Sequence, residues 1–278
     1  PRIKMQFEHL TYSKDSHIVT LTLNRPERLN AISPPMNLEL WEAINTFRED
    51  NDAWVCILTG AGDRAFCAGN DLKWRSENPG VQTPGIVPGT EYQSNPKIPG
   101  PAGTLPTELW KPLIAAVHGY AVGGGMELTM HCDIVIASDD AKFGVPEIKN
   151  IGGVPGGSGI LRLQRQLPYK VALWMLMSGE FMSADYMHSL GYVNEVVKKD
   201  DLLITAKKYA EILCNNPPIG VQTAKEVAIR SLDLPIDHPP TAWQYLWTGL
   251  TDKMRNSEDA HESRQAWLEK RKPNYKNK

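Results

Sequence analysis

Short apolar runs alternate with longer amphipathic runs along the first half of the chain. Residues 17–23 are β-branched and alternate between apolar and polar positions, which predicts a strand. After Ser33-Pro34-Pro35 the apolar residues recur at helical spacing and Ser33 is a suitable N-cap, which predicts a helix. Further strands are predicted at 53–58, 113–117 and 133–138, and a helix at about 126–132. This order predicts an α/β core with mostly parallel strands and right-handed crossovers.

The second half of the chain has a helical pattern from residue 159 onward. The predicted helical segments are 161–167, 169–177, 184–190, 203–214, 221–232 and 240–270. Residues 78–105 interrupt the regular order, because they are rich in proline and glycine and show little periodicity. A connection of this length without secondary structure is uncommon in a compact domain and is typically functional or disordered.

Length and charge exclude several classes of partner. The 278 residues suffice for one large domain or two modest ones, and the formal net charge of −2 provides no positive field for nucleic acid. No segment approaches the roughly 20 apolar residues that a membrane span needs, and residues 1–5 carry no apolar signal segment. We therefore expect a cytoplasmic protein with neither nucleic acid nor a membrane as partner.

The cysteines and histidines give no sign of a disulfide framework or a metal site. None of the four cysteines (Cys56, Cys67, Cys132 and Cys214) forms a CxxC pair, and each lies among apolar neighbours. Buried, reduced thiols are therefore expected. The seven histidines show no metal-binding spacing, so no metal is expected.

Three glycine-rich segments resemble known motifs but lack an essential part of each. Residues 60–65 match a loose GxGxxA dinucleotide fingerprint, but the residues that follow predict a turn where the helix should begin, so NAD binding is rejected. Residues 156–160 fail the G-x-S-x-G pattern of a nucleophile elbow, since Ile160 occupies the last position. Residues 123–125 lack the Lys-Ser/Thr of a P-loop.

Two glycine turns carry the candidate chemistry. One is the segment 66–72 after a predicted strand, and the other is 118–128, where a strand passes through three glycines into a helix. Glycine allows a ligand close to the backbone, and amides at a helix N-terminus can stabilise an oxyanion. Glu127 lies in the first turn of that helix, and Glu147 follows a strand. Glu127 could instead only complement the helix dipole, and Glu147 could be a solvated loop acid. A facing pair of carboxylates would suit proton transfer at carbon or water.

Motifs along nearly the whole chain, in the right order, resemble the enoyl-CoA hydratase/isomerase (crotonase) family. Among them are Gly123-Gly124-Gly125-Met126-Glu127-Leu128 and Phe143-Gly144-Val145-Pro146-Glu147. The other matching segments are 24–31, 65–73, 111–119, 132–134, 154–157, 191–197 and 266–273. The run 71–74 and the tail resemble the carnitinyl/crotonobetainyl-CoA hydratase branch.

The resemblance implies a fold, an assembly and an activity. It implies an α/β spiral of ββα units at 1–200, a helical trimerisation region at 201–278, and a homotrimer or dimer of trimers. The implied activity is a hydro-lyase that adds water across the 2,3 double bond of an enoyl-CoA. The amides of Asn70 and Gly124 would form the oxyanion hole, Glu127 would act mainly as base, and Glu147 would donate a proton to Cα.

The resemblance also implies a binding site for the coenzyme A thioester. The acyl-CoA would be the substrate, and no separate cofactor is expected. The implied binding residues are Arg28, Leu29, Ala31, Ala68, Asp71, Leu72, Trp74, Pro155, Gly156, Trp267 and Lys270. Ala68 and Leu72 would lie near the adenine, Trp74 would border the acyl pocket, and the tail residues Trp267 and Lys270 would often come from a neighbouring subunit. Arg28 and Lys270 could equally be solvated surface charges.

The chain departs from the family pattern in two segments, which leaves alternative activities open. The family usually has a helix where this chain has residues 78–105, which suggests a bulky, branched or cyclic acyl group. The segment 148–154 is about one residue longer than usual, with an extra glycine. The alternatives are an isomerase, a hydrolase of C–C bonds in a cyclic acyl-CoA, and a catalytically silent acyl-CoA-binding or RNA-associating member. The presence of both acids favours the hydratase.

Overall fold

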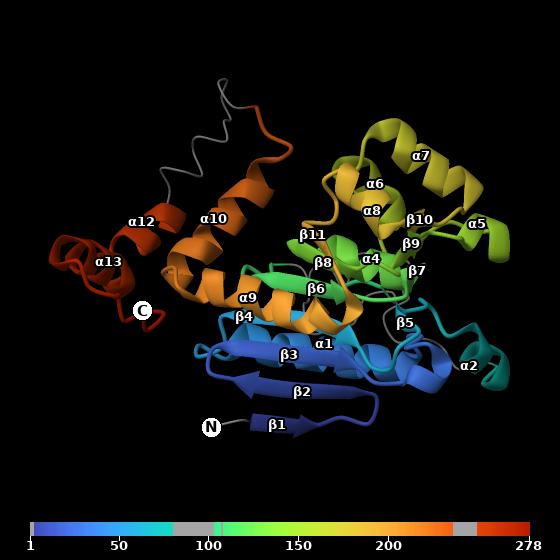
Figure 1. Ribbon diagram of the computed structural model, residues 1–278, viewed down its shortest axis with the longest axis horizontal. Coiled ribbons are helices and arrows are strands. Elements are labelled where there is room, and N and C mark those ends of the chain that lie inside the picture. Colours follow the sequence, from blue (N-terminus) through green and yellow to red (C-terminus); the bar gives the residue numbers. More distant parts are fainter. Residues whose placement is uncertain (1–2, 80–102, 107, 236–248) are drawn as a thin grey trace.

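The chain forms a strand–strand–helix unit three times in succession (Figure 1). The computed structural model describes residues 3–79, 103–106, 108–235 and 249–278. The units are β4 (Val55–Gly60), β5 (Ala65–Cys67) and α2 (Leu72–Glu77); β6 (Leu113–Val117), β7 (Tyr120–Val122) and α4 (Gly124–His131); and β8 (Ile134–Ser138), β9 (Lys142–Gly144) and α5 (Glu147–Asn150). The predicted α/β spiral of ββα units is confirmed.

The two strands of each unit belong to different sheets. The larger sheet has the order β1-β2-β3-β4-β6-β8-β11 and the smaller one β10-β9-β7-β5. β4, β6 and β8 are parallel neighbours, and so are β5, β7 and β9. Most pairings are therefore parallel, as predicted. Antiparallel pairings join β1 (Ile3–Gln6), β2 (Leu10–Asp15) and β3 (Ile18–Leu23) at one edge, and β9 to β10 (Met182–Ser183) at another.

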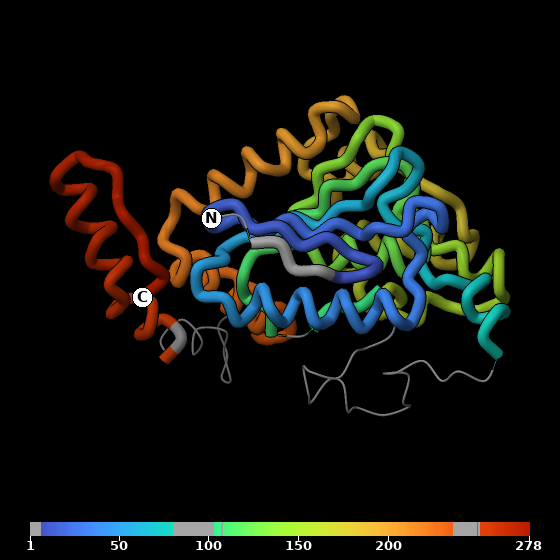
Figure 2. The backbone as a smooth tube through the Cα atoms, turned by 90° about the horizontal axis from the view of Figure 1, so that it is seen from below, coloured from blue at the N-terminus to red at the C-terminus, as the bar shows by residue number. Residues whose placement is uncertain are grey.

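Helices cover both faces of the larger sheet, which lies between them in Figure 2. α1 (Pro34–Glu49) packs on one face, where Cys56 and Leu58 of β4 join its core, and α9 (Leu202–Cys214) packs on the other with Val55 and Ile57. This alternation follows from the two-residue period of a strand. The Ser33 side chain accepts a hydrogen bond from the Met36 amide, which confirms the predicted N-cap.

The chain after residue 158 is mainly helical, as predicted. Its further elements are α6 (Gly159–Gln166), α7 (Tyr169–Ser178), α8 (Ala184–Ser189), β11 (Glu195–Val197), α10 (Pro218–Ser231), α12 (Gly249–Arg255) and α13 (Glu258–Glu269), with 3₁₀ turns η1 (Pro26–Arg28) and η2 (Lys199–Asp201). α12 and α13 lie at the end of the molecule opposite α5 (Figures 1 and 2). The division between 1–200 and 201–278 stays a prediction.

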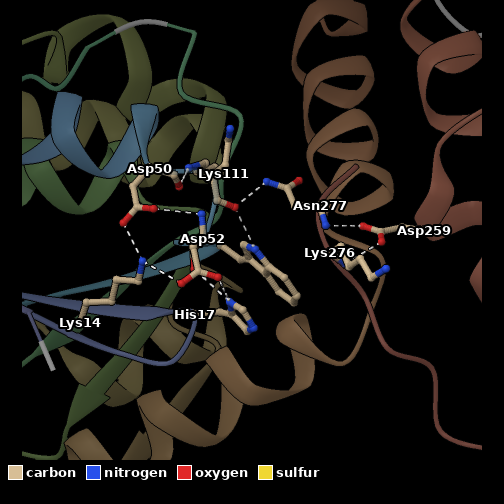
Figure 3. Close-up of polar contacts among 10 residues, drawn as sticks. Lys14, His17, Asp50, Asp52, Lys111, Asp259, Lys276 and Asn277 are labelled. Carbon is tan, nitrogen blue, oxygen red and sulfur yellow. Dashed lines mark hydrogen bonds and ion pairs between the residues drawn. The ribbon is translucent and has the colours of Figure 1, made fainter. Parts of the chain in front are cut away.

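A polar cluster joins the C-terminal tail to the body of the fold (Figure 3). The Asp259 carboxylate accepts the amides of Lys276 and Asn277, and the Asn277 side chain donates to the Asn51 carbonyl at 2.8 Å. Beside it, the Lys111 ammonium group donates to the backbone of the last turn of α1 and the residue after it. Asn277 thus links Asp259 on α13 to the loop after α1. Within the described residues, no helix is long and apolar enough to cross a membrane.

The packing of α1 gives a test of the fold. Leu40 is fully buried in the core, whereas Leu38 on the same helix is 43% exposed. We expect Leu40→Ala to lower the free energy of unfolding by about 2–5 kcal/mol, because it leaves a cavity. Leu38→Ala should change it by no more than about 0.5 kcal/mol. Urea denaturation of both variants measures the difference, and equal losses would contradict this packing.

Candidate active site

The candidate site lies where three parallel strands of the smaller sheet end. Asn70 follows β5, Gly124 follows β7 and Glu147 follows β9. Because β5, β7 and β9 are parallel neighbours, their carboxyl ends lie at the same edge. Ligands of open α/β sheets typically bind outside this edge. The topology thus brings together three segments that lie far apart in the sequence.

The two glycine turns approach each other so closely that a side chain would not fit between them. Gly69 has φ +84°, and a Cβ atom built on it would lie 2.8 Å from the Gly124 nitrogen. The Ile32 amide donates to the Gly69 carbonyl, and the Asp71 amide donates to the Ile32 carbonyl. These bonds fix the turn on either side of Asn70.

The amides of Asn70 and Gly124 are available for a ligand in this arrangement. In the described part of the chain, neither amide donates a hydrogen bond to a backbone carbonyl or a side chain. Gly124 is the first residue of α4, so its N–H lies in the turn that leaves donors unused by the helix. Two such neighbouring donors can stabilise negative charge on a carbonyl oxygen.

Glu127 is held in the first turn of α4 by an amide from a distant segment. Its side chain is buried, and Oε1 accepts the Gly159 N–H at 2.6 Å. Its other oxygen faces Gly103, where a Cβ atom would lie 3.0 Å from Oε2. Gly103 has φ +90°, which favours glycine at this contact. A glutamate that only complements the helix dipole would be exposed to solvent, whereas Glu127 is buried and hydrogen-bonded to Gly159.

Glu147 is the first residue of the single-turn helix α5, beside the second glycine turn. A Cβ atom on Gly123 would lie 3.2 Å from Glu147 Oε1. Oε2 is buried and, within the described residues, has no hydrogen-bond partner. A buried oxygen normally has a partner in protein or water, so a water or substrate group next to Oε2 is expected. Glu147 is therefore no solvated loop acid.

Both carboxyl groups hold protons more strongly than an exposed glutamate. The pKa of Glu127 is raised to about 7, mainly by burial and in part by the nearby charge of Glu147, against the opposing effect of the Gly159 and Gly157 amides. Burial also raises the pKa of Glu147. Two acids with raised pKa values and different surroundings can offer a proton and a proton acceptor near neutral pH.

The loop before α1 lies against the first glycine turn. The Leu29 carbonyl accepts the Ala68 amide at 3.0 Å, and Leu29 has a left-handed backbone. Arg28 lies 3.3 Å from Glu77 on α2. Ala31 is buried, whereas half of Leu72 is exposed. Of the predicted coenzyme A residues, Leu29 and Ala68 are thus joined by a hydrogen bond, and Arg28 pairs with the end of α2, the helix that begins at Leu72.

Asp71 and Trp74 stabilise the glycine turn that carries Asn70. The Asp71 side chain accepts the Trp74 amide at 2.9 Å and caps α2, while its other oxygen pairs with Arg25 at 2.9 Å. Asp71 is buried, so its carboxylate stabilises the turn that carries Asn70.

The remaining predicted residues fall into two places. Pro155 lies next to Gly159, where a Cβ atom would approach it to 2.9 Å, and Gly156 is in the same loop with open space at its Cβ position. Trp267 and Lys270 are at the end of α13, away from α4 and α5, and both are exposed. A single chain does not bring them to the acids.

Two contributors to the site are absent from the predicted set. Gly159 supplies the amide to Glu127, and Gly103 closes over its other oxygen. The 156–160 cluster that fails as a nucleophile elbow thus provides a hydrogen-bond donor. Gly103 belongs to the proline- and glycine-rich stretch, of which residues 80–102 lie outside the described residues. The extra glycine near 152 has φ +63°, and the Gly153 amide donates to the Glu147 carbonyl.

The family model of enoyl-CoA hydratase/isomerase matches residues 13–278. The chain belongs to this family. It is 37% identical over 268 residues to (E)-benzylidenesuccinyl-CoA hydratase of Thauera aromatica, covering 96% of this chain and 98% of that protein. It is 36% identical to carnitinyl-CoA dehydratase of Citrobacter koseri, covering 97% and 98%.

A solved structure confirms the fold. The crystal structure of an enoyl-CoA hydratase/isomerase from Mycobacterium paratuberculosis matches with a TM-score of 0.85 at 35% identity, covering 98% of this chain and 100% of that one. The crotonase fold and the hydro-lyase class predicted from the sequence are confirmed, and the family supports an acyl-CoA substrate.

The raised pKa of Glu127 predicts a dependence of stability on pH. The carboxyl group titrates near 4.5 when unfolded and near 7 when folded, so between these values the folded protein binds more protons. We expect stability to fall as pH rises from about 5 to 7, by about 3 kcal/mol. In Glu127→Gln the free energy of unfolding should no longer fall over this pH range, whereas in Glu211→Gln on α9 it should fall as in the wild type.

Urea denaturation between pH 5 and 8 measures the effect. Parallel curves for the wild type and Glu127→Gln would show that the Glu127 pKa is the same in the folded and unfolded states.

Proposed function

We propose that the protein adds water across the 2,3 double bond of an enoyl-CoA thioester, or removes it from the 3-hydroxyacyl-CoA. The observation that carries the proposal is the pair of acids, the buried Glu127 and the partly buried Glu147, beside the two available amides. The hydratase and dehydratase relatives support the same reaction class. Both relatives act on coenzyme A thioesters by name, which supports this substrate class.

The oxyanion hole activates the substrate in this mechanism. The thioester oxygen accepts hydrogen bonds from the amides of Asn70 and Gly124. Attack of water at Cβ produces an enolate, and these hydrogen bonds stabilise the negative charge on its oxygen. Both donors are backbone groups fixed by neighbouring turns, so little reorganisation accompanies the charge development. Gly69 is required because any side chain there would enter the space between the donors.

The two acids position one water and exchange two protons. Glu127 accepts a proton from the water as its oxygen bonds to Cβ, and Glu147 donates a proton to Cα. The Gly159 amide supports this role for Glu127, because a hydrogen bond from N–H stabilises a carboxylate. Glu147 Oε2 has no hydrogen-bond partner among the described residues, which supports the presence of a proton or a water there. In the reverse reaction the roles exchange.

The coenzyme A part lies along Arg28, Leu29 and Ala31, with Ala68 and Leu72 near the adenine. It enters as part of the substrate, and the proposed reaction uses no other cofactor. Trp267 and Lys270 join the site of a neighbouring subunit in a trimer or a dimer of trimers. Their exposure and the position of α13 at the end of the molecule away from α4 and α5 (Figure 1) support this arrangement.

Substitution of either acid tests the mechanism. We expect Glu127→Gln and Glu147→Gln each to lower kcat by about 10²–10⁴-fold, because each removes a proton-transfer group and leaves the hole intact. Hydration of crotonyl-CoA and of aryl-substituted enoyl-CoA thioesters is measured by loss of the conjugated thioester absorbance.

The products and a control separate the alternatives. Mass spectrometry detects one added water for a hydratase and no mass change for an isomerase. Glu211→Gln, on an exposed position of α9, should keep the wild-type rate. Wild-type rates in both acid variants would refute the two-glutamate mechanism.

Substitution of Gly69 tests the oxyanion hole. The Cβ of Gly69→Ala would lie 2.8 Å from the Gly124 nitrogen at φ +84°, so the turns must separate. We expect kcat to fall by about 10²–10³-fold, as for the loss of one oxyanion donor. Gly220→Ala is the matched control, because its Cβ would meet nothing closer than 3.7 Å. A folded Gly69→Ala enzyme with unchanged kcat would place the hole elsewhere.

A further inference from the structure

A polar stripe on α6 contacts the last turn of α4. Ser158, Arg162 and Gln166 recur every four residues and therefore share one face of the helix. Ser158 Oγ lies 3.4 Å from Nε2 of His131, and the Gln166 side chain donates to the Met130 carbonyl at 2.9 Å. Arg162 Nε donates to Ser158 Oγ at 3.1 Å.

The same turn of α6 also contacts the base. Gly159, directly after Ser158, donates its amide to Glu127 Oε1. His131 follows Glu127 by four residues, so both side chains lie on one face of α4. The start of α6 thus contacts two successive turns of α4, with an amide at Glu127 and a hydroxyl at His131.

Ser158 has an unusual backbone for a residue with a side chain. Its φ is +85° and its ψ is −1°, in the left-handed region that glycine adopts readily and other residues rarely do. Such a conformation persists where surrounding contacts hold it. The contacts of the hydroxyl with Arg162 and His131 provide that hold.

The direction of these hydrogen bonds follows from the chemistry of the groups. Arg162 can only donate, so Ser158 Oγ accepts from it and its own proton is free to go to His131. Burial, together with the positive charges of Arg162 and Lys225, holds the pKa of His131 well below its usual value. A neutral imidazole can accept at Nε2. Lys225 on α10 is itself paired with Asp133 at 2.7 Å.

We propose that Ser158 is a positioning residue, whose hydroxyl, held between Arg162 and His131, aims the Gly159 amide at Glu127. The proposal rests on the proposed function, since it concerns the orientation of the base. In this proposal, Glu127 is oriented by the Gly159 amide and also, through that amide, by the hydrogen-bonded side chains of Arg162, Ser158 and His131. These side chains act through the Gly159 amide rather than on the substrate, so their effect is expected on kcat and on the pH profile.

Two substitutions of Ser158 test the proposal. Ser158→Ala removes the hydroxyl and keeps the strained backbone, whereas Ser158→Gly removes both the hydroxyl and the strain. We expect each to lower kcat roughly 10–100-fold, the effect typical of outer-shell partners, with little change in KM. A misaligned Gly159 amide no longer stabilises the Glu127 carboxylate, so the pKa of Glu127 should rise. The acid limb of the pH profile of kcat/KM should therefore move to higher pH. The charged group facing Glu127 is Glu147, and those facing His131 are Arg162 and Lys225.

Variants of His131 provide a second measurement. His131→Ala should reproduce the loss, while His131→Gln, whose amide oxygen can accept the hydroxyl proton, should restore most of the rate and the pH profile. Arg165→Gln is the matched control, because Arg165 lies on the exposed side of α6 and donates to its own helix. It should behave as the wild type.

Three results would overturn the proposal. One is a Ser158→Ala enzyme with wild-type kcat and pH profile, and another is a His131→Gln enzyme as impaired as His131→Ala. The third is a Ser158→Gly enzyme with full activity beside an impaired Ser158→Ala, which would assign the effect to backbone strain. Glu127→Gln is measured in parallel. An inactive Glu127→Gln with an unaffected Ser158→Ala refutes only the positioning role, whereas an active Glu127→Gln refutes the role of Glu127 as the base in the proposed function.

Discussion

The close approach of two glycine turns is the constraint on which the rest of the site depends. Gly69 packs against the Gly123–Gly124 turn with no room for a methyl group, and this contact sets the separation of the amides on either side. The ββα order makes the contact possible, because β5 and β7 end side by side in one parallel sheet. The larger sheet and its helices act as a rigid frame for this edge. A donor pair built from backbone needs no side-chain ordering when a substrate binds.

The burial of Glu127 and the partial burial of Glu147 are costly for the fold, and the surrounding backbone limits the cost. Removing a carboxylate from water favours its neutral form, which accounts for the raised pKa of Glu127 and of Glu147. The Gly159 amide opposes this effect at Glu127, whereas Glu147 keeps one oxygen without a partner in the described residues. The two acids thus have different environments, and a difference of this kind separates a proton acceptor from a proton donor.

Local pattern predicts the parts of the fold whose signals are local. The alternation at 17–23, the Ser33 cap and the apolar run at 113–117 each identified an element that the structure contains. β5, β7 and β9 have three residues each, too few to show a period, although they determine where the site lies. The contacts of Gly159 and Gly103 with Glu127 join segments more than 20 residues apart, so no spacing could reveal them. The proposed roles of Glu127 and Glu147 come from the resemblance to the family, and the raised pKa values of both groups are consistent with them.

Similarity over the whole chain does not select the acyl group. The benzylidenesuccinyl-CoA and carnitinyl-CoA relatives differ in acyl chemistry, yet this chain is 37% and 36% identical to them. The proposed chemistry uses backbone amides and two carboxyl groups, and it touches only the thioester and the two carbons next to it. Any acyl group with the same thioester and the same two adjacent carbons can therefore undergo the proposed reaction. Selectivity must therefore come from side chains that line the acyl group, and these can vary without altering the glycine turns. This separation explains how one site can serve hydration of chemically different acyl-CoA substrates.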